Sequence, residues 1–240
     1  MSWAVSRSDD PVLDTQMDQA FEPVIKHAAD GLHERPPNQT GRTPILLFCA
    51  VEDTGRNNPD TSYPGNLCNS SVLRIGAATG LGDIWPVTND AAHFLLPGAK
   101  VDEPGEAEHY YGTSSPASDL SASSPSTPSQ QQHRVITGSS VSTALAAGLA
   151  GIILYLARVS AILMASGEYE GKDYIDSQGF ADLHKHDVMD KVFRKMCDSK
   201  INFVRAWDTF QPILDTLDNR QLDSKKKMED ISRLVWKLCA

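Results

Sequence analysis

The chain has 240 residues, of which 40% are hydrophobic and 22% are charged, and its formal net charge is −9. This composition is ordinary for a globular protein, and the length suffices for one large domain or for one domain with an appendage. The acidic balance argues against nucleic acid as the main partner, because neutralising phosphates requires a basic surface.

Three short apolar runs in the first hundred residues predict buried parallel strands. The runs are PILLFCA (44–50), SVLRIGAAT (71–79) and HFLLPG (93–98). Continuous apolar runs of this length are typical of strands that are covered on both faces. Apolar residues at helical spacing over 11–31, with Pro23 among them, predict a helix before the first strand. We therefore expect the α/β class with a parallel sheet.

The amino-acid composition changes twice in the middle of the chain. Residues 112–132 are rich in Ser, Pro and Gln, and such a composition predicts a mobile, disordered insertion. The apolar stretch after it, RVITGSSVSTALAAGLAGIILYL (134–156), predicts a long buried helix. Its continuation over 144–165 is apolar enough for a membrane span, but Arg158 lies inside it and its flanks lack anchoring residues. We therefore expect a helix inside the domain and no membrane partner.

Beyond Gly167 the pattern is that of surface helices. Acidic and basic residues alternate, and apolar residues recur at helical spacing, which predicts about three amphipathic helices. The expected organisation is a domain over residues 1–165 followed by a small all-helical tail over 166–240, whose surface is a candidate site for a protein partner.

The cysteines and histidines predict neither a disulfide nor a metal site. Four cysteines occur without zinc-type spacing, and residues 1–12 contain no signal-peptide pattern, so we expect thiols in an intracellular, cytoplasmic protein. His184 and His186 would point to different faces of a helix, while His184 and Asp187 would share one. A solvated helix surface explains this group, and no metal or cofactor is expected.

Hydroxyl side chains cluster in front of the long apolar helix, in GSSVSTALAAG (138–148). A serine at such a position is usually a helix cap, yet a helix N-terminus also stabilises an anion that forms beside it. The stretch resembles the nucleophile turn of the subtilisin-like serine proteases, G-T-S-M-A-T-P-H-V-A-G. The matching positions are Gly138, Ser140, Thr143, Ala147 and Gly148. The resemblance implies that Ser140 is a catalytic nucleophile.

Upstream stretches resemble the same family in the same order. PILLFCAVEDTG (44–55) is similar to V-V-V-A-A-G-N-E-G, and AHFLLPG (92–98) to V-D-L-x-A-P-G. SYPGNLCNSSVLRIGAAT (62–79) resembles Y-P-A-x-x-x-x-V-I-x-V-G-A-T, and MSWA (1–4) resembles the strand N-M-S-L-G that runs beside the substrate. The resemblance covers residues 1–165 and is strongest to divergent intracellular subtilases of filamentous fungi, which carry a helical tail. It implies a three-layer fold and substrate binding by Ser2 and Trp3.

Two departures from the family pattern concern catalysis. The family's triad runs Asp, His, Ser along the chain, and the positions of the Asp and the His would precede Met1. None of the seven histidines lies in a family-like motif. His93 falls in the FLLPG strand, and His27, His33 and His109 are the other candidate bases.

The second departure lies in the oxyanion hole. The family places an Asn amide at the position that aligns with Asp53, and an ionised carboxylate accepts hydrogen bonds but donates none. Losing one such donor lowers the rate by roughly 10²–10³-fold. The resemblance implies an oxyanion hole formed by the Ser140 N–H together with Asp53.

The sequence supports two hypotheses for the function. The first is a hydrolase, a serine endopeptidase that cleaves polypeptide substrates through Ser140 and requires an Asp and a His that this chain does not supply. The alternative is a catalytically inactive interaction module derived from such an enzyme, or a truncated gene product whose preceding segment holds the missing residues.

Overall fold

The computed structural model describes residues 10–30, 44–58, 61, 65, 71–102, 135–167, 173–198 and 200–239. The predicted substrate-binding residues Ser2 and Trp3 lie outside these ranges. The predicted disordered insertion at 112–132 and the candidate bases His33 and His109 also lie outside them.

A parallel sheet lies at the centre of the molecule. Its strands β1 (Leu47–Ala50), β2 (Val72–Ala78) and β3 (Phe94–Pro97) are neighbours in chain order, and both pairs are parallel. The predicted α/β class with a parallel sheet is thereby confirmed. The first strand starts three residues later than expected, because the Ile45 N–H donates to the Ala28 carbonyl at the end of the preceding helix. A two-stranded antiparallel pair, β4 (Val101–Asp102) and β5 (Val135–Ile136), was not predicted.

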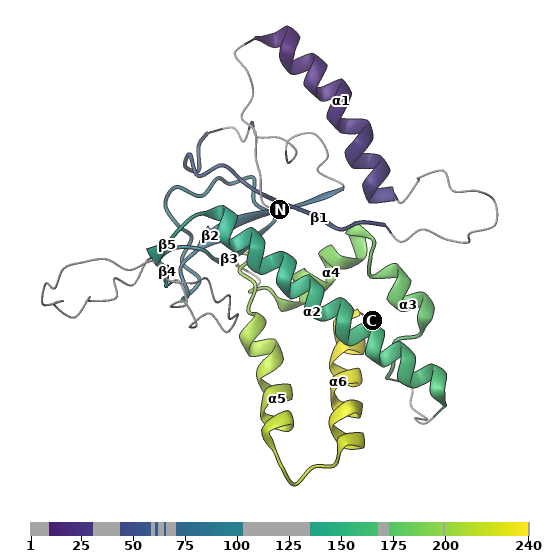
Figure 1. Ribbon diagram of the computed structural model, residues 1–240. Coiled ribbons are helices and arrows are strands. Elements are labelled where there is room, and N and C mark those ends of the chain that lie inside the picture. Colours follow the sequence, from purple (N-terminus) through teal and green to yellow (C-terminus); the bar gives the residue numbers. More distant parts are fainter. Residues whose placement is uncertain are drawn as a thin grey trace, which may run out of the picture.

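Helices cover both faces of the sheet, and the alternation of side chains along the strands decides which residue meets which helix. Cys49 and Val72 pack against Ile25 of α1 (Pro11–Asp30) on one face. Leu73 and Ile75 belong to the larger core on the other face, beneath α2 (Ser139–Ser166). Figure 1 shows α1 and α2 separated by the strands. The sheet therefore forms the middle of three layers.

The long helix α2 begins at Ser139 and ends before Gly167, which adopts the left-handed conformation with φ 70°. Residues on one side are buried, among them Ala146, Ile153 and Ala157. The prediction of a buried helix is correct for that side only, since Ile152 and Tyr155 on the other side are exposed. Among the described helices α2 alone is long and apolar enough to cross a membrane, by length and composition only.

In the part of the tail that the structure describes there are four helices, where about three were expected. They are α3 (Ser177–Asp182), α4 (His186–Met196), α5 (Ala206–Asp218) and α6 (Ser224–Cys239). Phe193 of α4 packs on Phe94 of β3, with ring centroids 5.3 Å apart, and on Phe48 of β1 at 6.1 Å. The tail and the sheet thus share one hydrophobic core. The predicted domain boundary at residue 165 stays a prediction.

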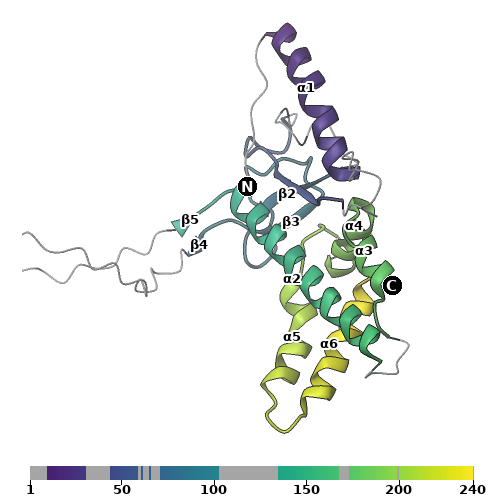
Figure 2. The same ribbon diagram turned by 45° about the vertical axis from the view of Figure 1, so that its right-hand side comes forward.

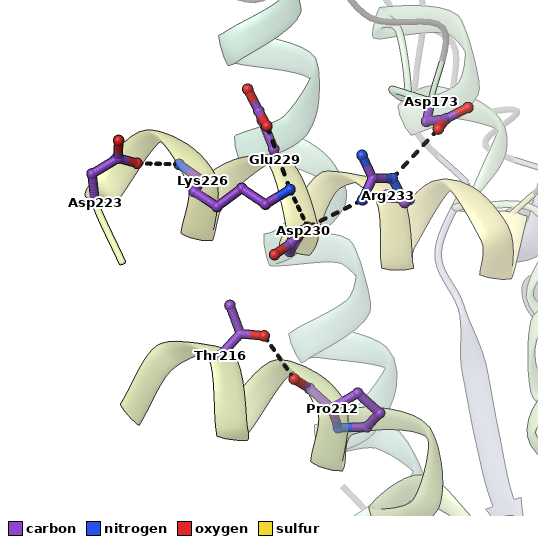
Figure 3. Close-up of polar contacts among 8 residues, drawn as sticks. All are labelled: Asp173, Pro212, Thr216, Asp223, Lys226, Glu229, Asp230 and Arg233. Carbon is purple, nitrogen blue, oxygen red and sulfur yellow. Dashed lines mark hydrogen bonds and ion pairs between the residues drawn. The ribbon is translucent and has the colours of Figure 1, made fainter. Parts of the chain in front are cut away.

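Helices α5 and α6 run side by side away from the sheet (Figures 1 and 2). The Asp223 side chain caps α6 by accepting from the Lys226 N–H at 2.7 Å. Charged side chains continue along α6: Lys226 pairs with Asp230 at 3.2 Å, and Arg233 reaches both Asp230 at 3.2 Å and Asp173 at 3.5 Å (Figure 3). Exposed pairs of this kind contribute at most about 1 kcal/mol each, so packing of the apolar sides holds these helices.

Candidate functional site

The first turn of α2 meets the carboxyl ends of all three parallel strands. The Gly138 N–H donates to the Gly98 carbonyl just after β3, at 2.7 Å. Asp53, three residues after β1, and Ala77 near the end of β2 contact the same turn. Polar side chains from distant parts of the chain therefore converge here, as is typical of sites in open α/β sheets.

Ser139 hydrogen-bonds both to β2 and to Asp53 in the loop after β1. Its side chain is fully buried, and its Oγ–H donates to Asp53 Oδ1 at 2.6 Å. Its backbone N–H donates to Asp53 Oδ2 at 2.9 Å, and its Oγ accepts from the Ala77 N–H at 3.1 Å. Asp53 thereby acts as the cap of α2, satisfying a backbone donor that no residue within the helix can reach.

Two further hydroxyls of this turn are buried and bonded. Ser142 Oγ donates to the Leu96 carbonyl of β3 at 2.9 Å. Thr143 Oγ1 donates to the Ser139 carbonyl, one turn back, at 2.7 Å. The cluster of hydroxyls in the sequence thus serves mainly to bind the helix to the strands.

Ser140 differs from these three residues. It is exposed, and neither its hydroxyl nor its N–H has a hydrogen-bond partner among the described residues. Both groups belong to the first turn of a 28-residue helix, at the end where the helix dipole is positive. The turn therefore presents one unbonded hydroxyl and one unbonded N–H, held in place by the anchored residues on either side.

Two glycines permit this close approach of helix and sheet. Gly138 has φ 138°, a conformation that residues with a Cβ rarely adopt. A Cβ at Gly98 would collide with Ser142 Oγ and would lie 2.8 Å from the Gly138 carbonyl oxygen. The position of Ser140 thus depends on two glycines that are 40 positions apart in the chain.

The loops that follow β1 and β2 are hydrogen-bonded to each other. The Gly55 N–H donates to the Val87 carbonyl at 2.8 Å, and Asn89 Nδ2 donates to the Asn58 carbonyl at 2.6 Å. The buried Thr88 hydroxyl donates to the Ala77 carbonyl at 2.8 Å. These bonds join the loop after β1 to the loop after β2, so Asp53 lies on a supported segment.

The charge distribution at this turn bears on the chemistry. An oxyanion formed on a substrate bound to Ser140 would be stabilised by the Ser140 N–H and the helix dipole. The Asp53 carboxylate occupies the same helix end and opposes a second negative charge there. Both side-chain oxygens of Asp53 bond Ser139, the residue that precedes Ser140. The predicted oxyanion hole formed by Asp53 and the Ser140 N–H stays a prediction. The role of Ser139 was missed, because the sequence does not show which of adjacent serines faces the sheet.

The described histidines do not lie at the turn. His93 precedes β3 and Gly98 comes after it, so a strand of four residues, about 13 Å long, separates His93 from this turn. Arg74 Nε lies 3.4 Å from the Nε2 atom of His93. Burial and the charge of Arg74 lower the pKa of His93 to about 4. His27 lies in the last turn of α1, on the other side of the sheet.

The described thiols lie outside the first turn of α2. Cys49, Cys197 and Cys239 are free thiols, and burial raises the pKa of Cys197 to about 11 and that of Cys239 to about 12. His184 packs edge-on against the Phe180 ring at 5.2 Å. Within the described ranges, no three His, Cys, Asp or Glu side chains gather into a possible metal site.

Comparisons with known proteins give distant likeness in structure only. No family model matches the chain, and no curated protein matches its sequence. A solved structure of a Ser-to-Ala mutant of the protease domain of PatA is similar at a TM-score of 0.42 and 13% identity. The aligned region covers 91% of this chain and 58% of that structure, so the chain spans less than two thirds of it. This likeness is too weak to carry an argument, so a functional assignment depends on the motifs and on the geometry of the turn.

Proposed function

We propose that this chain carries the nucleophile of a subtilisin-like serine endopeptidase, with Ser140 as the attacking residue. One observation supports this proposal most directly. Of the four hydroxyl residues at the start of α2, only Ser140 is exposed and without a hydrogen bond to the described residues, whereas Ser139, Ser142 and Thr143 are buried and hydrogen-bonded. A structural cap would be expected to use its hydroxyl in a hydrogen bond, as Ser139 does.

The proposed reaction is acyl transfer to serine. Ser140 Oγ attacks the carbonyl carbon of a peptide bond and loses its proton to a general base, and the bond to the leaving nitrogen breaks as that nitrogen receives the proton. Water then hydrolyses the acyl-enzyme. The Ser140 N–H donates to the oxyanion, and Asp53 assists only in its protonated form, because an ionised carboxylate has no proton to donate. We place the substrate in extended form beside Ser2 and Trp3.

The base comes from outside the described residues in this proposal. A serine hydroxyl is a weak nucleophile without a base within about 3 Å. We therefore expect no labelling of the chain alone by a fluorophosphonate probe, and slow labelling when concentrated imidazole supplies the base.

Peptide mapping by mass spectrometry identifies the labelled residue. The proposal predicts an adduct on Ser140 that requires imidazole and disappears in Ser140→Ala. Rapid labelling without imidazole would show that a histidine of this chain serves as the base. A lack of labelling with imidazole would contradict the proposal.

The alternative function is a catalytically inactive interaction module. The Asp53 carboxylate favours it, since this group already occupies the helix end where an oxyanion would form. In either case we propose a polypeptide partner, a second protein contact through the helices after residue 166, and an intracellular setting. The three free thiols among the described cysteines support that setting.

A further inference from the structure

Helix α2 carries large apolar residues on its exposed side as well as on its buried side. Its uncovered side, here called the open face, comprises Leu145, Gly148, Ile152, Tyr155, Arg158 and Ile162, which recur at helical spacing. Tyr155 is 66% exposed and Ile162 is 59% exposed. The three parallel strands, α3 and α6 pack against the other side of α2. A contiguous patch of exposed apolar side chains is typical of a binding surface, so we expect another molecule to cover the open face.

The open face borders a groove. A cavity of about 720 Å³ lies between the first half of α2, the ends of β2 and β3, and the start of α5. Leu145 and Ile152 form one wall, and Trp207, which is 67% exposed, stands on the other. At Gly148 and Gly151 a Cβ would meet no atom within 4 Å, so a partner backbone can approach α2 closely there. From Leu145 to Ile162 the helix extends about 25 Å, which matches about 17 residues of a second helix.

The charge on the open face selects among the possible occupants. Arg158 is exposed and has no hydrogen bond or ion pair within the described parts of the chain, and residues 144–162 contain no Asp or Glu. A second copy would bring a second Arg158 and no carboxylate. A lipid bilayer would leave the guanidinium unpaired among acyl chains. A helix with one carboxylate among its apolar residues would bury the face and pair the arginine.

We propose that the open face of α2 binds an amphipathic helix of a partner protein, which places a Glu or Asp opposite Arg158. This mode of binding is helix in groove, with apolar anchors at a spacing of three and four residues. The face begins one turn after Ser140, so the bound helix ends beside that hydroxyl. The inference does not depend on catalysis and holds equally for an inactive module.

The test uses two synthetic peptides and the full chain. Each peptide has 18 residues, capped ends, Leu and Ala on one side, Gln and Lys on the other, and a fluorescent label. One carries Glu at the centre of the apolar side and the other carries Lys there. Fluorescence anisotropy should show that the Glu peptide binds about 10-fold more tightly than the Lys peptide. Arg158→Glu should reverse this preference.

A steric variant separates binding from folding. Gly151→Leu should weaken both peptides about 10-fold and leave the unfolding midpoint equal or higher, because its side chain enters open space in a helix. Equal binding of the two peptides, or a preference that Arg158→Glu leaves unchanged, would overturn the proposal. Dimers in sedimentation that Gly151→Leu dissociates would assign the face to a second copy. Binding to phosphatidylcholine vesicles without peptide binding would assign it to a membrane.

Discussion

Substituting Ser139 by alanine removes two of the hydrogen bonds that join the first turn of α2 to β2 and to the loop after β1. The change deletes a fully buried hydroxyl that donates to Asp53 at 2.6 Å and accepts from the Ala77 N–H at 3.1 Å. A hydrogen bond to a charged group contributes about 1.5–3 kcal/mol, and a buried donor left without a partner costs about 1–3 kcal/mol. Because the Ser139 N–H still reaches Asp53, part of the anchor remains. We expect Ser139→Ala to lower the free energy of unfolding by about 2–4 kcal/mol.

The neighbouring serine is the matched control. Ser140→Ala removes an exposed hydroxyl without a partner in the described structure, so it should change the free energy of unfolding by less than about 0.5 kcal/mol. Urea unfolding followed by circular dichroism measures both variants on one scale. Asp53→Asn should lower the free energy of unfolding much less in the Ser139→Ala variant than in the native chain, because the two side chains interact directly. Equal effects of Ser139→Ala and Ser140→Ala would refute this account of the turn.

Three further predictions concern packing, pH and thiols. Gly98→Ala should lower the free energy of unfolding by more than about 3 kcal/mol because its Cβ has no room, whereas Gly148→Ala should raise it by up to about 1 kcal/mol; thermal melts compare the two. His93 has a folded pKa of about 4, below its ordinary value of 6.5, so the unfolded chain binds its proton more readily and stability should fall as the pH drops from 6.5 to 4. Because His93 is partly exposed, this loss of folding stability should be only about 1 kcal/mol. The variant His93→Gln should not show it. If the variant loses as much stability as the native chain over this pH range, His93 is not the group responsible. Cys197 and Cys239, with pKa values of about 11 and 12, should react with Ellman's reagent at pH 8 at least ~100-fold more slowly in the folded chain than in urea, and fast reaction of either would show that its site is open.

The order of strands could be predicted because each lies in a continuous apolar run. PILLFCA, SVLRIGAAT and HFLLPG contain β1, β2 and β3 in turn. Parallel strands end at one edge of the sheet, so Asp53 and Ser140 could be expected to lie close together. The two-residue strands β4 and β5 could not be predicted, since they are too short to show a period.

Other features depend on tertiary contacts that a pattern does not reveal. A run of serines and a threonine does not show which hydroxyl faces the sheet, so the anchoring by Ser139 and the isolation of Ser140 required the structure. The long apolar run of α2 predicted a buried helix, but the sequence does not show which of its apolar residues, such as Ile152, remain exposed. The described part of the tail has four helices where about three were expected, because the helical conformation is interrupted between Asp182 and His186.

The proposed function requires that the first turn of α2 be an oxyanion site beside a nucleophilic Ser140, with the Asp53 carboxylate opposing the charge. Its most direct test is the rate at which a fluorophosphonate labels Ser140 in the presence of imidazole, measured in the native chain and in Asp53→Asn. Replacing the carboxylate by an amide removes a negative charge from the helix end and introduces a donor, so the rate should rise by at least ~10-fold in the folded variant. An unchanged or lower rate in a variant shown by circular dichroism to be folded would contradict the claim.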